Sequence, residues 1–333
     1  MWCRRRCSSC WAATGRSTTS SVRWRTTTRP SPVADRGRVQ HSRGAPGQPR
    51  TVAYLYLAPA LLVFGCFMAW PLLRAVWLSL FEWDGLSVGT WVGLGNYVDV
   101  LTDPQLRAPF VHSLVLVVFF SALPIVAGMV LAGLMSRARL RGSGFFRTVI
   151  FLPQVVAMVV VAIAWRDIYA PEGSINDALS AVGLDGLARA WLGEPSFALM
   201  AVGLVGTWVG TGLCMVLFLA GLAKVPRELY ESATLDGAGP LRQFLAVGLP
   251  ALRGELAVAM TLTLVAALRT FDLVYVMTDG GPGRSTRVPS YEVYRWSLEE
   301  GKVGYGVTIA LLLTAAILLL TIGINRVAEG DRR

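Results

Sequence analysis

Three cysteines near the start of the chain have the spacing of an iron–sulfur ligand set. Cys3, Cys7 and Cys10 fall within the first ten residues, and thiolates at such spacings can hold a cluster. A motif of this kind belongs in a loop of a folded barrel, and no βα repeats follow these cysteines. We therefore interpret them as thiols of an unstructured leader. His41 and His112 are too far apart to indicate a metal pair, so the sequence predicts neither a metal site nor a cofactor.

Two ionisable residues fall inside an apolar run and are the strongest candidates for polar chemistry there. Arg269 and Asp272 are three residues apart, which places them on one face of a continuous helix, where they can neutralise each other. Ionisable groups inside a membrane are costly and usually face a cavity or a partner. Two interpretations stay open: a polar wall of a substrate path, or a structural pair that reaches the headgroups.

Nucleotide chemistry has no residues of its own in this sequence. The chain has no Gly-x4-Gly-Lys-Ser/Thr loop, and its only Gly-Lys pair, Gly301-Lys302, lacks both the upstream Gly and the following hydroxyl. With no catalytic constellation evident, we predict that the chain is not an enzyme. ATP, if it powers this protein, is bound by another chain.

The elements that position these residues are membrane helices. The 333 residues are 54% apolar and only 16% charged, a balance that is rare in a soluble domain. Spanning the hydrocarbon takes roughly 20 helical residues, and in lipid only helices and closed barrels satisfy the backbone. We predict an all-α membrane protein with six transmembrane helices: Tyr54–Leu73, Phe110–Met135, Thr148–Trp165, Phe197–Ala223, Leu256–Met277 and Val303–Ile324.

Charge in the loops predicts the orientation, because short cytoplasmic loops carry excess Lys and Arg. The loop between spans two and three holds four arginines and no acid, and the polar stretch before span five holds Lys224, Arg227, Arg242 and Arg253. The loops after spans one and three are acidic. The final loop is balanced and takes its side from parity. We therefore expect a multi-pass protein of the plasma or inner membrane with both termini in the cytoplasm. The expected domains are a leader (1–50), the first span with its outer loop (51–109), a transmembrane domain (110–325) and a cytoplasmic tail (326–333).

The basic leader accounts for the whole net charge of +10. Residues 1–50 contain eleven arginines and one acid, Asp35. This composition cannot bury enough apolar surface to offset chain entropy, so we expect disorder. Two alternatives stay open: an arm for nucleic acid or anionic lipid, and a translation start at Val33 or Val39. We favour disorder and predict no nucleic-acid partner.

The segment 224–250 is too hydrophilic to cross a bilayer, yet it has clear helix signals. Pro226 suits the first helical position, and Glu228 and Glu231 then lie near the positive end of a short helix that reaches about Leu235. Asp236-Gly237 predicts its end, with Gly237 in a left-handed conformation. Pro240 can begin a second helix, and Pro250 marks the start of span five. Patterning alone is equally consistent with a connector that rests on headgroups.

The same segment resembles the cytoplasmic coupling loop of permeases from binding-protein-dependent ABC importers. That family has Glu-Ala-Ala, three residues, Gly, nine residues and Ile-x-Leu-Pro. The residues here on that spacing are Glu231, Ser232, Ala233, Gly237, Val247, Leu249 and Pro250. Ser232 replaces the usual Ala, and Val247 replaces the commoner Ile.

The resemblance implies the type I importer fold and a mechanical role for this loop, hereafter the coupling segment (224–250). In the family its short helix docks into a cleft of an ATP-hydrolysing subunit. The implied contact residues are Glu228, Leu229, Tyr230, Glu231, Ser232, Ala233, Asp236, Gly237, Leu249 and Pro250. The implied partners are a second permease subunit, two ATP-binding subunits, an extracellular solute-binding protein and membrane lipid.

Further resemblance points to the carbohydrate-uptake branch with maltose- and glycerol-phosphate-type permeases. The stretch Tyr54-Leu-Tyr-Leu-Ala-Pro and the later Thr278-Asp-Gly-Gly-Pro282 are similar to segments of that branch. The second implies an outer turn that contains Gly280, Gly281 and Pro282. We expect a sugar or sugar-like cargo. Two alternative functions stay open. One is an ion-coupled secondary transporter, which only Arg269 and Asp272 support, and the other is a membrane scaffold or receptor.

Overall fold

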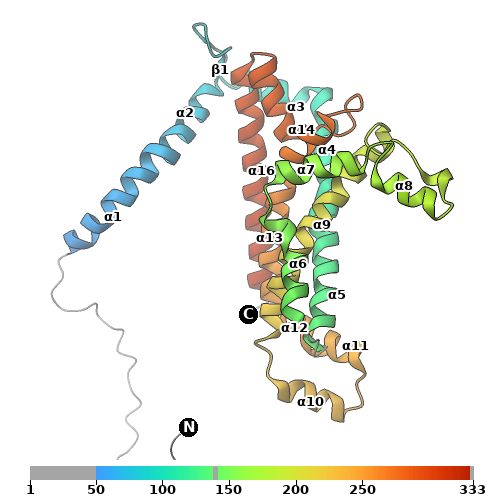
Figure 1. Ribbon diagram of the computed structural model, residues 1–333. Coiled ribbons are helices and arrows are strands. Elements are labelled where there is room, and N and C mark those ends of the chain that lie inside the picture. Colours follow the sequence, from blue (N-terminus) through green and yellow to red (C-terminus); the bar gives the residue numbers. More distant parts are fainter. Residues whose placement is uncertain (1–49, 138–141, 331–333) are drawn as a thin grey trace, which may run out of the picture. The chain divides into compact units, whose positions relative to one another are not determined.

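The computed structural model describes residues 50–137 and 142–330. The predicted leader apart from Arg50 lies outside the described residues, as do Cys3, Cys7, Cys10, His41 and the last three residues of the predicted tail. Contacts divide the chain into two units, Met1–Ala60 and Leu61–Arg333. The first unit is described only from Arg50, as the beginning of the first helix, and the second contains the helical bundle of Figure 1.

Helices account for nearly all of the described structure. In chain order the elements are α1 (Arg50–Phe64), η1 (Gly65–Ala69), α2 (Trp70–Leu78), β1 (Phe81–Glu82), β2 (Thr90–Trp91), α3 (Gly95–Thr102), α4 (Pro104–Val117), η2 (Val118–Ala122), α5 (Leu123–Arg137), α6 (Ser143–Val155), α7 (Met158–Ile168), α8 (Ser174–Ala181), η3 (Asp185–Leu187), α9 (Pro195–Leu222), α10 (Arg227–Leu235), α11 (Pro240–Gln243), η4 (Phe244–Gly248), α12 (Leu249–Ala251), α13 (Arg253–Leu268), α14 (Asp272–Thr278), α15 (Pro289–Tyr294), η5 (Arg295–Glu299) and α16 (Val303–Gly330).

Four of the six predicted spans are continuous helices of sufficient length and apolarity. They run over Tyr54–Leu78, Pro104–Ser136, Pro195–Leu222 and Val303–Arg326. Short π-helical segments interrupt the α-helical hydrogen bonding without ending the helix; η1 lies in the first span and η2 in the second. The prediction of membrane helices at these four places is confirmed.

The other two predicted spans are broken. In the third, α6 and α7 meet at a bend of 98°, and α7 leaves the bundle direction. Just before the fifth, the helical stretch Pro240–Ala251 meets α13 at a bend of 71°. Within the fifth, the helix ends at Leu268 before α14 begins. The segments predicted as spans over 148–165 and 256–277 are therefore interrupted helices, and the described residues have up to six spans if each bent pair is one span. Apolar composition locates a segment at membrane depth but does not require that it be straight.

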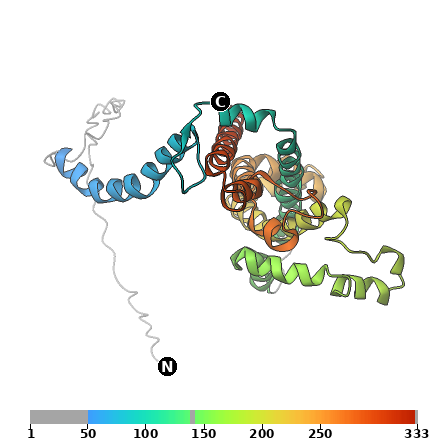
Figure 2. The ribbon, with the colours of Figure 1, turned by 90° about the horizontal axis from the view of Figure 1, so that it is seen from above.

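The helix α9 forms the centre of the bundle. More than half of its apolar window, 56%, is buried, against 33% for Pro104–Ser136 and 17% for Val303–Arg326. Small residues let its neighbours approach closely: a β-carbon on Gly212 would lie 2.4 Å from the Ile150 carbonyl oxygen of α6. Viewed from above, Figure 2 shows α7 and α8 extending along one side of this bundle. Side chains from α9 contribute to both of the larger apolar clusters, so α9 holds the other helices in place.

Candidate functional site

The coupling segment projects from one end of the bundle as two short helices (Figure 1). Pro226 is the residue before α10, with an extended ψ of 139°, so the prediction that it begins the helix is wrong by one position. Gly237 has φ of +75°, as predicted for the residue just past the helix end. Pro240 begins α11, also as predicted. Gln243 ties the two helices, because its amide nitrogen donates to the Ala238 carbonyl oxygen at 2.7 Å and the Thr234 hydroxyl at 3.0 Å.

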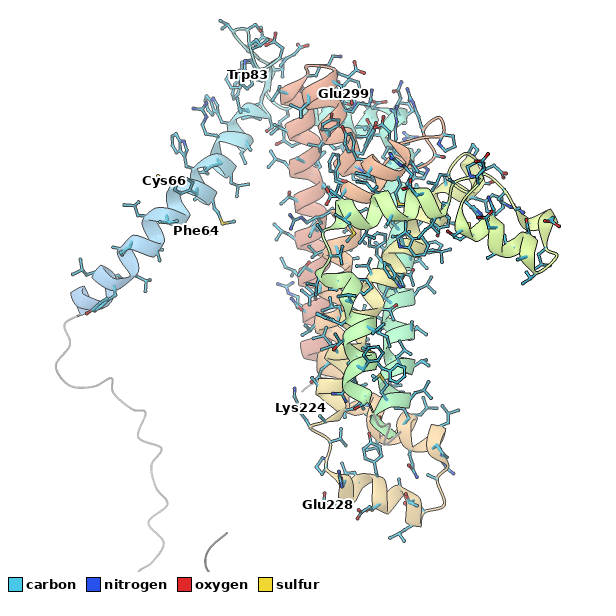
Figure 3. The ribbon with its side chains drawn as sticks, in the orientation of Figure 1. Phe64, Cys66, Trp83, Lys224, Glu228 and Glu299 are labelled. Carbon is cyan, nitrogen blue, oxygen red and sulfur yellow. The ribbon has the colours of Figure 1, made fainter. Side chains whose placement is uncertain are left out.

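The helix α10 contains no buried residue. It carries all of the predicted contact residues from Glu228 to Ala233, while Leu249 and Pro250 lie on α12 beside the start of α13. Leu229 is 50% exposed and Leu235 is 90% exposed. Figure 3 shows Glu228 at this end of the bundle, with Lys224 above it. The segment thus presents apolar and acidic side chains that no other part of the described chain covers.

The base of the coupling segment is closed by an ion pair. Lys224, just after α9, lies with its Nζ 2.8 Å from Glu255 Oε1 on α13. Beside this pair, Leu252 is fully buried against the end of α9, where Gly221 leaves room for its side chain. The two ends of the segment are therefore held together, and the residues between them extend beyond the bundle.

A cavity of about 410 Å³ lies inside the bundle and contains both predicted path residues. Arg269 and Asp272 line it with the aromatic side chains of Phe120 and Phe271. Arg269 is the residue after α13 and Asp272 is the first residue of α14, so they do not share a continuous helix. No ion pair joins them in the described structure. The prediction that they lie on one helix face was wrong, because the helix breaks between them.

Each of the two interrupted spans has a helix break at this cavity. Gln154 and Met158 flank the bend between α6 and α7, and both line the cavity wall. Arg269 and Asp272 flank the break between α13 and α14. Non-helical backbone at membrane depth is tolerated where protein or a water-filled cavity satisfies it. In transporters, binding sites are typically formed by such discontinuous helices. The cavity therefore has the geometry of a solute site.

The Gly-Gly-Pro turn (279–283) lies at the opposite end of the bundle from the coupling segment. Asp279 and Gly280 both adopt left-handed conformations, with φ of +50° and +74°. The Tyr291 hydroxyl donates to the Asp279 carbonyl oxygen at 3.0 Å. Burial, and after it the Asp279 charge, raise the pKa of Tyr291 to about 12. The turn is held rigidly and its conformation agrees with the predicted tight geometry.

A buried carboxylate follows this turn and was not among the predicted site residues. Glu292 is 1% exposed. Its Oε2 accepts from Arg295 at 2.9 Å, and its Oε1 lies 3.4 Å from Arg287 Nη1. His112 of α4 lies 2.8 Å from the Arg287 carbonyl oxygen through Nδ1. The only sign of Glu292 in the sequence was the equal number of acidic and basic residues in the final loop. Such equality within one short loop is consistent with ion pairs inside that loop.

Comparison with known proteins identifies the family. Residues 113–331 match the family described as binding-protein-dependent transport system inner membrane component. The chain is 38% identical to a probable ABC transporter permease protein, YurN of Bacillus subtilis, over 82% of this chain and 95% of that protein. It is 32% identical to the diacetylchitobiose uptake system permease NgcF of Streptomyces coelicolor, over 91% of this chain and 90% of that protein.

A solved structure confirms the fold. A bacterial ABC transporter involved in the import of the acidic polysaccharide alginate contains a chain that aligns with a TM-score of 0.73 at 21% identity, covering 85% of this chain and 96% of that chain. The helical bundle, with its cavity at two helix breaks, is thus a membrane transport component of the type I importer fold. The chain belongs to the binding-protein-dependent ABC importer permeases. Members are non-catalytic inner membrane subunits, and this membership favours ATP-driven import over an ion-coupled carrier or a scaffold.

Proposed function

We propose that this permease carries a sugar or sugar-like solute and forms half of the translocation path. A second permease subunit completes the path, and two ATP-binding subunits drive it. The observation that carries this proposal is the cavity at the two helix breaks, where Arg269 and Asp272 line the wall beside Phe120 and Phe271 and form no ion pair within the described residues. A sugar offers hydroxyl groups to such charged side chains and an apolar ring face to aromatic rings. Permeases named for sugars are among its relatives.

The coupling segment is the proposed joint to an ATP-binding subunit. Its support is the exposure of α10, the apolar side chain of Leu229, and the acidic side chains of Glu228 and Glu231 on one short helix. Closure of the ATP-binding subunits would move this helix together with its counterpart, and the spans would then open alternately to the two sides. In this arrangement the coupling segment and both termini lie in the cytoplasm, and the Gly-Gly-Pro turn lies outside, beneath the solute-binding protein.

The test is ATP-dependent uptake by the assembled transporter in proteoliposomes. The wild-type complex should accumulate sugar in the proteoliposomes only when ATP is enclosed in them and the solute-binding protein is present. Arg269→Ala and Asp272→Ala should each reduce the uptake rate at unchanged expression, whereas Glu231→Arg should release the ATP-binding subunit during purification. Wild-type uptake rates in both cavity variants would remove these residues from the path. Co-purification of the ATP-binding subunit with Glu231→Arg at wild-type yield would exclude that contact.

A further inference from the structure

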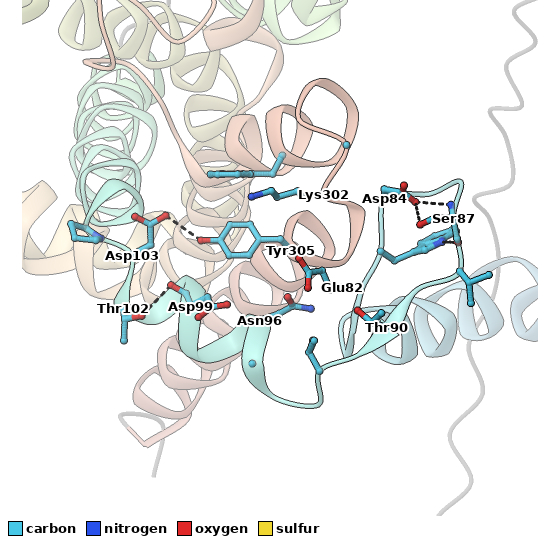
Figure 4. Close-up of a pocket in the computed structure, with 17 residues that line it drawn as sticks. Glu82, Asp84, Ser87, Thr90, Asn96, Asp99, Thr102, Asp103, Lys302 and Tyr305 are labelled. Atoms are coloured by element: carbon cyan, nitrogen blue, oxygen red, sulfur yellow. Dashed lines mark hydrogen bonds between the residues drawn. The ribbon is translucent and has the colours of Figure 1, made fainter.

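A second and larger cavity lies at the end of the bundle opposite the coupling segment. It measures about 770 Å³, within the range of sites for small molecules. Its walls are the β1–β2 hairpin, α3, the start of α4 and the start of α16 (Figure 4). We name it the hairpin cavity. The central cavity that contains Arg269 is lined by different residues throughout.

The walls of the hairpin cavity are fixed by hydrogen bonds. Asn96 of α3 donates to the carbonyl oxygens of Ser79 and Phe81 at 2.8 and 2.9 Å, which ties α3 to the hairpin. The Gly304 amide of α16 donates to the Trp83 carbonyl oxygen at 3.1 Å. Three separate parts of the chain therefore meet in a defined arrangement, and the cavity does not depend on an unsupported loop.

Aromatic rings and carboxylates alternate around the hairpin cavity. Trp83 and Tyr305 are half-exposed in its wall. The Trp83 indole donates to the Ser87 carbonyl oxygen at 2.8 Å, and the Tyr305 hydroxyl donates to Asp103 at 3.1 Å, so both rings are held in place. Figure 4 shows Tyr305 between Asp103 on one side and Glu82 on the other. Held rings of this kind offer flat apolar faces on which a sugar ring can stack.

Two of the four carboxylates have no partner in the described part of the chain. Asp84 accepts from the Leu86 and Ser87 amides at 2.9 and 2.7 Å, and Asp103 is occupied by Tyr305 and the Gln105 amide. Glu82 of β1 and Asp99 of α3 remain as free acceptors among the described residues. Among the described residues, no three acidic, His or Cys side chains converge closely enough to hold a metal ion. Separated acceptors suit a ligand with several hydroxyl or ammonium donors better than they suit a single ion.

The charge of the hairpin cavity sets its selectivity. Its lining holds four carboxylates and one cation, Lys302, and therefore a formal charge of −3. Such a wall accepts hydrogen bonds from neutral sugars, attracts ammonium groups and repels carboxylates. We propose that the hairpin cavity is a binding site for the incoming solute, and that it selects neutral or amino sugars over acidic ones. This inference rests on the proposed function, since it assigns a class to that cargo.

The test is saturation-transfer NMR on the assembled transporter in nanodiscs, with three disaccharide probes. These are maltose, the glucosamine dimer and digalacturonate. The wild type should bind the first two, with digalacturonate at least tenfold weaker. The double variant Glu82→Gln with Asp99→Asn should bind the glucosamine dimer at least tenfold more weakly than the wild type does. The difference in affinity between this dimer and digalacturonate should become smaller. The matched control, Glu172→Gln with Asp185→Asn, removes the same charge from two exposed positions outside the cavity and should bind as the wild type does.

Three results would overturn the inference: equal binding of digalacturonate, identical binding by the two double variants, or no binding of any probe by the wild type. Uptake measured on the same preparations separates this inference from the proposed function. ATP-dependent sugar uptake that is unchanged in the cavity variant, together with unchanged binding, leaves the function standing and removes the cavity site. Variant-sensitive binding in a complex that moves no sugar with ATP supports the cavity and contradicts the function.

Discussion

The conformation of Gly237 gives the sharpest test of the coupling segment. Gly237 has φ of +75° and Gly239 has φ of −66°, and a β-carbon at either position would have no atom of another residue within 4 Å. Substitution by alanine therefore adds no clash at either site, and only the backbone conformation differs. The left-handed region is about 1–2 kcal/mol less favourable for an L-residue than the right-handed region. Gly237→Ala should therefore carry this conformational cost, and Gly239→Ala should not.

If an ATP-binding subunit docks on the segment in this conformation, the strain appears as lost affinity. About 1–2 kcal/mol corresponds to a roughly 5- to 30-fold rise in the Kd, since 1.4 kcal/mol is about tenfold. In the assay, a fluorescently labelled ATP-binding subunit is titrated against permease in nanodiscs, and the Kd is obtained from the fluorescence change. Gly237→Ala should weaken binding by this factor, and Gly237→Asn should weaken it less, because asparagine tolerates the left-handed region better. Gly239→Ala is the control.

Equal affinities for Gly237→Ala and Gly239→Ala would refute the reasoning. They would mean that the segment docks in a different backbone conformation, so that the turn at Gly237 has no role in placing α10. A loss in both variants would point instead to general flexibility of the 236–240 connection. Only a loss confined to position 237, graded from alanine to asparagine, agrees with a joint whose angle is set by one residue.

Other predictions follow from the packing and charge of the bundle. Glu292→Ala should lower the free energy of unfolding by about 3–5 kcal/mol, because it removes the carboxylate partner of Arg287 and leaves Arg295 with only the exposed Glu300. Exposed Glu299→Ala should change it little in thermal denaturation. Gly212→Ala should destabilise by about 1–3 kcal/mol through its clash with the α6 backbone, and Gly323→Ala, which has open space, should not. The Ser87 and then the Leu86 amide lower the pKa of Asp84 from 3.8 to about 2, so its stabilisation of the hairpin is complete above pH 3.8 and is lost as the pH falls through 2. The protection factor of the Ser87 amide, the ratio of its intrinsic exchange rate to its observed rate at the same pH, should fall across that window in the wild type and be low throughout in Asp84→Ala.

The features that the sequence predicts correctly depend on local backbone chemistry. Pro240 begins a helix and Gly237 ends one because proline fixes φ and glycine permits positive φ, whatever surrounds them. The four straight spans are likewise predicted by length and apolarity alone. The error at Pro226 is a single residue at a helix boundary, where capping and helical positions are hardest to separate.

The features that the sequence does not predict depend on contacts between distant segments. The breaks at Val156 and Thr270 occur in apolar runs without a glycine at the break, because backbone groups freed there are satisfied by the surrounding protein. Thr270 shows this: its hydroxyl donates to Ala266, and its carbonyl oxygen accepts from Ser290 of α15. The unpaired state of Arg269 and Asp272 follows from the same break. The expectations for residues 1–49, 138–141 and 331–333, which lie outside the described structure, stay predictions.

The helix α13 has a joint at each end. Its 16 residues span about 24 Å. A 71° bend separates it from the coupling segment, and the break at 269–271 separates it from α14. If the coupling segment is the joint to an ATP-binding subunit, as proposed above, α13 would act as a rigid link, and a displacement at one of its ends would reach the other end with little loss. Stiffness along α13 would then set how much motion reaches the cavity, so Val258→Pro, at an exposed position of α13 outside the cavity lining, should uncouple ATP hydrolysis from transport while both end sites stay intact.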